Sequence, residues 1–197
     1  MGHEIKIQAE ILSDDVCQFT IDRAVYPDKS WYFSDKDDAK GSPLVGKLFE
    51  IENIMAVLIS DNVVKVIKTG FDDWMPIAKQ IGSTIRTQLE SGEPAIAGNL
   101  GADLPPEDEI RAQVQRVVDE QINPSVAQHG GYVELLDVKE NRIFLQLGGG
   151  CQGCGMAYVT LRQGIEKAIR EAVPQVGEIF DVTDHAGGRN PYYAPTK

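Results

Sequence analysis

Apolar residues in the first ninety positions follow two different periods. Short runs rich in Ile, Val and aromatic residues, bounded by polar and turn-forming residues, predict β-strands. From Trp74 onward the apolar residues recur every three or four positions instead, which predicts a helix of about four and a half turns with one apolar face. A shorter helix is predicted over residues 42–49, with Pro43 in its first turn. The predicted strands cover residues 5–12, 16–21, 54–60 and 63–68, with a hairpin turn at Asp61 and Asn62.

The second half of the chain orders its elements differently. Ile110, Val114 and Val117 have helical spacing, and we expect this helix to stop near Asn123, because a residue before proline is disfavoured in a helix. Two alternating segments, 132–138 and 142–147, predict an antiparallel hairpin. A second helix is predicted to end at Val173, before Pro174, and a last strand over 176–182 is expected to return parallel to the second strand of the hairpin.

A segment without periodicity separates these two patterns. Residues 91–106 are rich in Gly and Pro, which is typical of an exposed linker. We therefore expect an α+β protein of two small domains: an N-terminal mixed sheet with a covering helix, and a C-terminal three-stranded sheet packed on helices. The expected boundaries are 1–92 for the first domain, 93–106 for the linker, 107–185 for the second domain and 186–197 for a flexible tail.

Charge narrows the classes of partner. The 197 residues carry a formal net charge of −11 at pH 7, so nucleic acid and anionic membrane surfaces would repel the chain as a whole. No apolar run approaches the roughly 20 residues that span a bilayer, and no secretion or organelle-targeting signal is recognisable at the N-terminus. We expect an unexported protein without nucleic-acid or membrane partners.

The most informative motif is a pair of cysteines two residues apart. Cys151 and Cys154 follow a strand and precede a helix, where free backbone N–H groups and the helix dipole favour thiolates. Closed zinc sites and cubane iron–sulfur sites usually need four ligands, and the third cysteine, Cys17, lies in the other predicted domain. If the pair binds a metal centre, a second chain is expected to complete the shell. We expect the glycines beside the pair, among them Gly148 and Gly149, to permit close approach of that second chain.

Other interpretations of these residues remain open on sequence grounds. The pair could act as a thioredoxin-like redox dithiol, form a structural zinc site, or be a chance pair in a Gly-rich turn. An antiparallel hairpin before the pair disfavours the redox interpretation. We interpret Cys17 as a small buried hydrophobe and Trp74 as a core residue. His129, before two glycines, is interpreted as a turn residue rather than a metal ligand.

Three stretches resemble a known family. QINPSVAQHGGYVEL, IFLQLGGGCQGCGMAYVTLRQGIEKAI and VPQVGEIFDVTDH are similar to the NifU-like C-terminal domain of the Nfu family of iron–sulfur cluster carriers and scaffolds. Residues 1–92 resemble that family's N-terminal domain through SPLVGKLFEI and IMAVLISDNVVKVIK. One departure is visible, because the family commonly has Asn-Pro near the end of its early strands, where this chain has Tyr26 and Pro27 in what we take as a turn.

The resemblance implies a function for the cysteine pair. It implies that Cys151 and Cys154 from each of two chains hold one [4Fe-4S] cluster in a homodimer, receive it from an upstream cluster donor and pass it to client apoproteins. The protein would then be a carrier and not an enzyme, in the bacterial cytoplasm, or in the mitochondrial matrix if the chain is a processed form. The alternative is a thiol–disulfide oxidoreductase that uses the same two cysteines.

Overall fold

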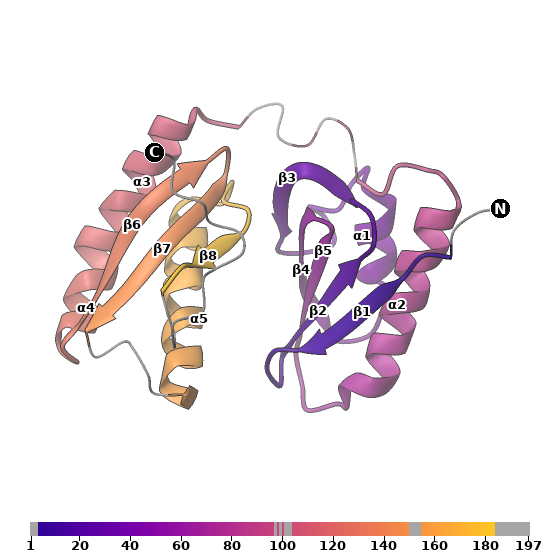
Figure 1. Cartoon of the computed structure of the whole chain (residues 1–197), viewed down its shortest axis with the longest axis horizontal. Coiled ribbons are helices and arrows are strands. Elements are labelled where there is room, and N and C mark those ends of the chain that lie inside the picture. Colours follow the sequence, from indigo (N-terminus) through magenta and orange to yellow (C-terminus); the bar gives the residue numbers. More distant parts are fainter. Residues whose placement is uncertain (1–3, 97, 99, 101–103, 150–154, 184–197) are drawn as a thin grey trace. The chain divides into compact units, whose positions relative to one another are not determined.

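The computed structural model describes residues 4–96, 98, 100, 104–149 and 155–183 (Figure 1). The chain divides into two compact units, Met1–Asp103 and Leu104–Lys197. Each unit combines one β-sheet with helices. The α+β class expected from the sequence is therefore confirmed.

The first unit contains a five-stranded sheet in the order β1-β2-β5-β4-β3. All four strand pairings in it are antiparallel. The expected mixed sheet is wrong in this respect, because the chain segment between β3 and β4 brings β4 back antiparallel to β3 and makes no parallel crossover. The strands are β1 (Ile7–Ile11), β2 (Val16–Ile21), β3 (Tyr26–Phe33), β4 (Ile54–Asp61) and β5 (Val63–Lys68).

The sequence analysis missed strand β3. Tyr26 and Pro27 begin this strand, whereas we expected a turn there. Proline cannot donate a ladder hydrogen bond, so it is tolerated in strands only at edges, at first positions or at bulges. Here β3 is an edge strand and its register with β4 shifts between Tyr26 and Ser30. The irregularity explains why no alternating pattern marked the strand.

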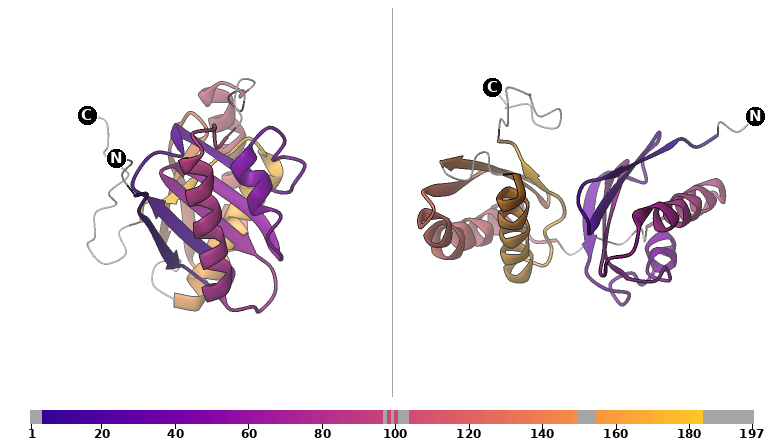
Figure 2. Two further views of the ribbon diagram at one scale, coloured as in Figure 1. Left: turned by 90° about the vertical axis from the view of Figure 1, so that its right-hand side faces the viewer. Right: turned by 90° about the horizontal axis from the view of Figure 1, so that it is seen from below.

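Two helices cover one face of this sheet. Leu44, Leu48, Ile81 and Ile85 are fully buried and share one core with Phe19 and other strand residues. The left view of Figure 2 looks onto α2, with the strands behind it. The helices are α1 (Pro43–Leu48) and α2 (Trp74–Glu90), close to the expected positions.

Part of the predicted linker packs against the first unit. Ala95 and Ile96 are only 6% and 5% exposed and belong to its core. The carbonyl of Ala95 accepts a hydrogen bond from the backbone N–H of Leu44 at 3.1 Å. The hydroxyl of Tyr26 donates to the carbonyl of Leu100 at 3.0 Å. The expectation of full exposure is wrong for this part of the linker, because its apolar side chains have a core to enter.

The second unit contains a three-stranded sheet in the order β6-β7-β8. β6 and β7 form the expected antiparallel hairpin, and β8 pairs parallel to β7. The last strand is shorter than expected, because only three residues pair with β7. The strands are β6 (Gly131–Lys139), β7 (Arg142–Gly149) and β8 (Ile179–Asp181).

The helical segment before this sheet does not stop at Asn123. A π-helical turn, η1 (Val118–Ile122), joins α3 (Glu107–Val117) to α4 (Asn123–Ala127). The N–H of Asn123 bonds to the carbonyl of Val118, five residues back, so Pro124 enters at the first turn of a new α-helical segment, where its missing N–H is tolerated. The expected helix end is therefore corrected.

One core joins the sheet and helices of the second unit. Val133, Leu145 and Leu147 of the sheet pack with Ile110, Val114 and Ile169 of the helices. The second helix, α5 (Gly155–Ala172), ends directly before Val173 and Pro174, as expected. Among the described residues, no helix has both the length and the apolar character needed to cross a membrane.

Candidate functional site: the end of strand β7

Cys151 and Cys154 lie outside the described residues. They belong to the segment between Gly149, the last residue of β7, and Gly155, the first residue of α5. The structure therefore describes the two elements between which the cysteine segment runs. The residues around the end of β7 come from β6, from the helical segment before it and from the segment after β8.

The glycine at position 148 is required by a contact within the same chain. Tyr132 of β6 is the register partner of Gly148, and its half-exposed ring lies over the glycine Cα. A Cβ at position 148 would overlap the Cζ, Cε1 and hydroxyl oxygen of this ring. The role that we expected for Gly148, space for a second chain, is corrected: the ring of Tyr132 occupies that space.

Gly149 meets backbone rather than a side chain. Its φ of +63° lies in the left-handed region, and a Cβ there would overlap the carbonyl oxygen of Gly130. Gly130 has a φ of +69° as well, and the next residue, Gly131, pairs with Gly149. Two close backbone segments thus leave no space for a side chain at the last residue of β7. Here too the space belongs to the same chain, which corrects our expectation for Gly149.

A threonine after β8 holds the other side of β7. The N–H of Leu147 donates to the side-chain oxygen of Thr183 at 2.7 Å. In return, the Thr183 hydroxyl donates to the carbonyl oxygen of Leu147 at 3.4 Å. Thr183 is 7% exposed. A polar side chain in this position satisfies backbone groups of β7 beyond the last residue pair of β8. Nothing in the sequence analysis singled out this residue.

Asn123 performs a similar role for β6. Its side-chain amide donates to the carbonyl of Val133 at 3.0 Å, and its amide oxygen accepts from the N–H of Val133 at 2.8 Å. Val133 directly follows Tyr132, so these bonds hold β6 beside the Tyr132–Gly148 pair. The sequence analysis used Asn123 only as a helix end. The combination of an asparagine, a proline and a glycine turn before a strand was the available signal.

His129 lies in the turn between α4 and β6, as expected. Its backbone N–H donates to the carbonyl of Val126 at 3.0 Å, and its side chain is exposed. No cluster of three or more His, Cys, Asp and Glu side chains suited to a metal ion occurs in the part of the chain that the structure describes. The described residues alone therefore provide no closed metal site.

Cys17 is confirmed as a buried core residue. Its exposed fraction is 0%, and it lies in β2, within the core of the first unit. Burial raises the pKa of its thiol from 9.0 to about 11, against the lowering effect of a backbone hydrogen bond from Glu10. A thiol with a raised pKa is a poor nucleophile and a poor metal ligand at neutral pH, because both roles need the thiolate.

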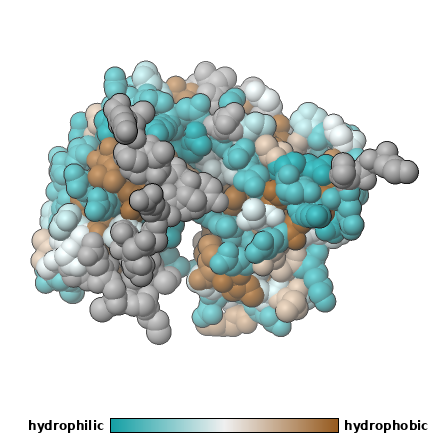
Figure 3. Space-filling model, in the orientation of Figure 1, coloured by the Kyte–Doolittle hydropathy of each residue, from teal (hydrophilic) through white to brown (hydrophobic). Residues whose placement is uncertain are grey.

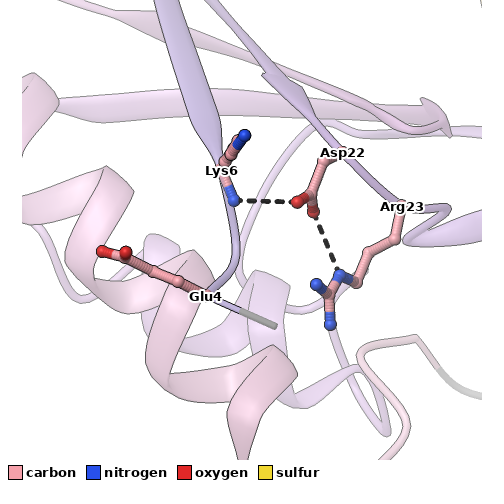
Figure 4. A pocket seen from close by; sticks show the side chains of 4 residues that line it. All are labelled: Glu4, Lys6, Asp22 and Arg23. Atoms are coloured by element: carbon pink, nitrogen blue, oxygen red, sulfur yellow. Dashed lines mark hydrogen bonds and ion pairs between the residues drawn. The ribbon is translucent and has the colours of Figure 1, made fainter. Parts of the chain in front are cut away.

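The first unit also has an open, charged pocket of about 510 Å³ (Figure 4). Its lining balances two acidic residues, Glu4 and Asp22, against Lys6 and Arg23. The backbone N–H of Lys6 and the Arg23 guanidinium both donate to the Asp22 carboxylate at 3.1 Å, and these bonds lower the pKa of that carboxyl group. A balanced, internally paired lining offers no net charge to an ionic ligand.

Two family models match the chain. Residues 9–92 match the N-terminal domain of the scaffold protein Nfu/NifU, and residues 114–180 match the NifU-like domain. Together these ranges contain strands β2 to β7, parts of β1 and β8, and most of the residues described above at the end of β7.

Curated relatives agree with these domains. The Fe/S biogenesis protein NfuA of Stenotrophomonas maltophilia K279a is 44% identical over 124 residues, which cover 62% of this chain and 61% of the relative. A protein of the same name from Pseudomonas savastanoi is 46% identical over 98 residues, 48% of each chain. The matched regions thus span less than two thirds of the relatives' own lengths.

A solved structure is similar to one part of the chain. The solution structure of a NifU-like protein from Saccharomyces cerevisiae has a TM-score of 0.41 and 18% identity, and the match covers 48% of this chain and 86% of that one. This similarity is too low to define a shared fold.

Proposed function

This chain belongs to the Nfu family, and on that premise we propose that it is an iron–sulfur cluster scaffold and carrier that passes its cluster to client apoproteins. The proposed cargo is one [4Fe-4S] cluster, received from an upstream donor. The protein binds and transfers this cargo without catalysing a reaction. The relatives named above are bacterial, which favours the bacterial cytoplasm over a mitochondrial matrix as its compartment.

The proposed ligands are Cys151 and Cys154 of two chains. A cubane cluster held by cysteines needs four thiolates, and this segment supplies two. The remaining cysteine, Cys17, is buried with a raised pKa, and this observation carries the proposal of a shared cluster. The cluster then lies at the interface of a homodimer.

The contacts that fix the last residues of β7 support this assignment. The Tyr132 ring over Gly148, the close backbone at Gly149 and the Thr183 bond to Leu147 fix the strand that leads into the cysteine segment. The helix α5 begins at Gly155, directly after Cys154, so its N-terminal dipole favours negatively charged groups there. Fixed elements on both sides of a ligand pair reduce the ordering cost of binding a cluster.

Half a ligand set per chain also suits transfer. A client that offers further thiolates can displace the ligands of one chain at a time, so the cluster need never be fully released. We assign cluster binding to residues 107–185 and client or donor recognition to residues 1–92. Residues 93–106 connect the two, and residues 186–197, proposed to form a tail, lie outside the described residues.

Reconstitution with iron and sulfide under anaerobic conditions tests the ligand assignment. We expect about four irons per two chains, and a cluster-loaded dimer in sedimentation. Cys151→Ala and Cys154→Ala should each abolish cluster binding, while Cys17→Ala, the matched control, should retain it. A cluster-loaded monomer, or loss of the cluster in Cys17→Ala alone, would contradict the proposal.

The same variants distinguish the redox alternative. A thiol–disulfide oxidoreductase would reduce insulin with its dithiol form, and this activity would disappear in Cys151→Ala. The antiparallel β6–β7 hairpin before the cysteines disfavours this alternative, since thioredoxin-like pairs follow a parallel βαβ arrangement.

A further inference from the structure

Four large apolar side chains are exposed at one end of the first unit's sheet. Ile11 is 57% exposed, Leu12 46%, Phe71 107% and Met75 60%. Figure 3 shows hydrophobic surface at the lower end of this unit, where Figure 1 places the β1–β2 turn. Single exposed apolar residues are normal on protein surfaces, whereas several from adjacent segments mark binding surfaces. We refer to Ile11, Leu12, Phe71 and Met75 as the apolar patch.

Hydrogen bonds hold the two segments of the apolar patch together. The indole N–H of Trp74, at the start of α2, donates to the carbonyls of Ser13 at 3.3 Å and Asp14 at 3.0 Å. Ser13 directly follows Leu12, and Met75 directly follows Trp74. The β1–β2 turn and the start of α2 are therefore fixed side by side, and the apolar patch is a preformed surface.

Exposed acidic residues lie close to the apolar patch in the sequence. Glu10, Asp14, Asp72 and Asp73 are each one or two positions from a patch residue. Lys68, three residues before Phe71, is buried, donates to the carbonyl of Gly70 at 3.2 Å and lies 5.1 Å from the centre of the Trp74 ring. The exposed cation on α2, Lys79, follows Met75 by about one turn of the helix. With these four exposed acidic residues against Lys79, the residues beside the patch carry a net negative charge.

We propose that the apolar patch docks a partner polypeptide whose apolar residues are flanked by lysines or arginines, such as a basic amphipathic helix. Apolar contact supplies the affinity, and the acidic residues beside the patch select a basic partner and speed its approach. A second copy of this chain is a poor occupant, because a symmetric contact would bring the two sets of acidic residues together. The proposal rests on the recognition role assigned above to residues 1–92 and gives it a surface.

Binding of a defined probe to the full chain tests the proposal. The probe is a fluorescent synthetic amphipathic helix built only from Leu and Lys, and its anisotropy reports binding. We expect the double variant Phe71→Ser with Met75→Ser to weaken binding at least about tenfold, since two exposed anchors are lost. The variant Glu10→Gln with Asp14→Asn should slow association and reduce its salt dependence, with little change in the dissociation rate.

Met55→Ser is the matched control. Met55 is 48% exposed, but it lies on β4, which contributes no residue to the apolar patch. Its substitution should leave probe binding unchanged. Equal weakening by Met55→Ser, or equal binding of a Leu and Glu helix, would overturn the proposal. So would a dimer of the cluster-free chain in sedimentation that Phe71→Ser dissociates.

The two proposals fail separately. Probe binding is measured on the cluster-free chain, so it does not depend on Cys151 or Cys154. Cluster loading of the Phe71→Ser and Met75→Ser variant should equal that of the unmodified chain. If the probe does not bind while the cluster assembles, the docking surface is wrong and the cluster assignment stands. If the probe binds while no cluster assembles, the cluster assignment is wrong and the docking surface stands.

Discussion

The ring of Tyr132 lies against the Cα of Gly148, its cross-strand partner, at the end of the β6–β7 hairpin. An aromatic ring over a glycine covers backbone that the glycine leaves open, and it fixes strand register where the glycine has no side chain to pack. The pair stands two residues before the cysteine-containing segment begins. Its role is therefore to position the strand end, and this role can be measured separately from metal binding.

The Tyr132 contact predicts coupled substitutions. Gly148→Ala should lower the free energy of unfolding by about 1 kcal/mol, because the half-exposed ring can move outward at the cost of its packing. In a Tyr132→Ala background the same change should cost little, since no ring remains to be displaced. Urea denaturation of the two single variants and the double variant gives this coupling as a double-mutant cycle. Strict additivity would show that the contact does not form.

Gly149→Ala should be more damaging than Gly148→Ala. The new Cβ would overlap the carbonyl oxygen of Gly130, which cannot rotate away, and the φ of +63° is unfavourable for alanine. We expect a loss of about 2–3 kcal/mol, from the left-handed backbone and the overlap together. Tyr132→Ala should not relieve it. The reverse order of the two glycine variants would contradict this account of the strand end.

Asn123 should be needed for the order of β6. Asn123→Ala removes both bonds to Val133, and we expect a loss of about 1–3 kcal/mol in the free energy of unfolding. Asn123→Asp keeps an acceptor for the Val133 N–H, so its stability should fall between that of the unmodified protein and that of Asn123→Ala. Hydrogen exchange of the Val133 amide provides a local measurement, and it should become faster in Asn123→Ala. Unchanged exchange would mean that the side chain does not hold this strand.

Cys17 should be unreactive in the native protein. Iodoacetamide at neutral pH should modify Cys17 only after denaturation, because burial excludes the reagent and holds the thiol protonated. The pKa rises on folding from 9.0 to about 11, so folding favours the protonated thiol. Its contribution to stability is fully present below pH 9 and is lost as the pH rises from 9 towards 11. A Cys17→Ala variant should lack this alkaline component of the stability profile.

Two helical glycines should tolerate and benefit from alanine. A Cβ at Gly82 of α2 or at Gly164 of α5 would meet no atom within 4 Å. Alanine is favoured over glycine within a helix by about 0.5–1 kcal/mol, so each substitution should stabilise the chain by about that amount. Thermal unfolding checks both. A loss of stability at Gly164 that occurs only in the cluster-loaded protein would indicate a close contact made in that state.

Periodicity predicted the fold where burial on one face determines the pattern. The strands β2 and β5 and the start of α2 at Trp74 lie where the sequence placed them, because each alternates or repeats against a single core. Strand β3 was not predicted, because an edge strand with Pro27 and a bulge has no continuous alternating pattern. The burial of Ala95 and Ile96 was not predicted, because two apolar residues among Gly and Pro show no periodicity. Only the tertiary fold shows that they are buried.

The sequence suggested the candidate ligands of the site, but it did not identify the residues that hold the end of β7. Two cysteines at short spacing are a chemical signal that needs no fold. Thr183 and Asn123 are polar residues whose partners are backbone groups distant in the sequence, so no local pattern identifies them. Gly148 and Gly149 were recognised as unusual, but their neighbours, Tyr132 and Gly130, are set by the register of the hairpin.

The π-helical turn at Val118–Ile122 also sets how this chain tolerates changes in length. A π turn holds one more residue than the α-helical turn that it replaces. Deleting one residue from it would restore a regular helix while turning everything before it by about 100° relative to Asn123. Either Ile110 and Val114 would leave the core, or Asn123 would leave Val133. Substitutions in this turn can be absorbed, whereas a single-residue deletion would separate the helix from β6, the partner of the strand that leads into the cysteine segment.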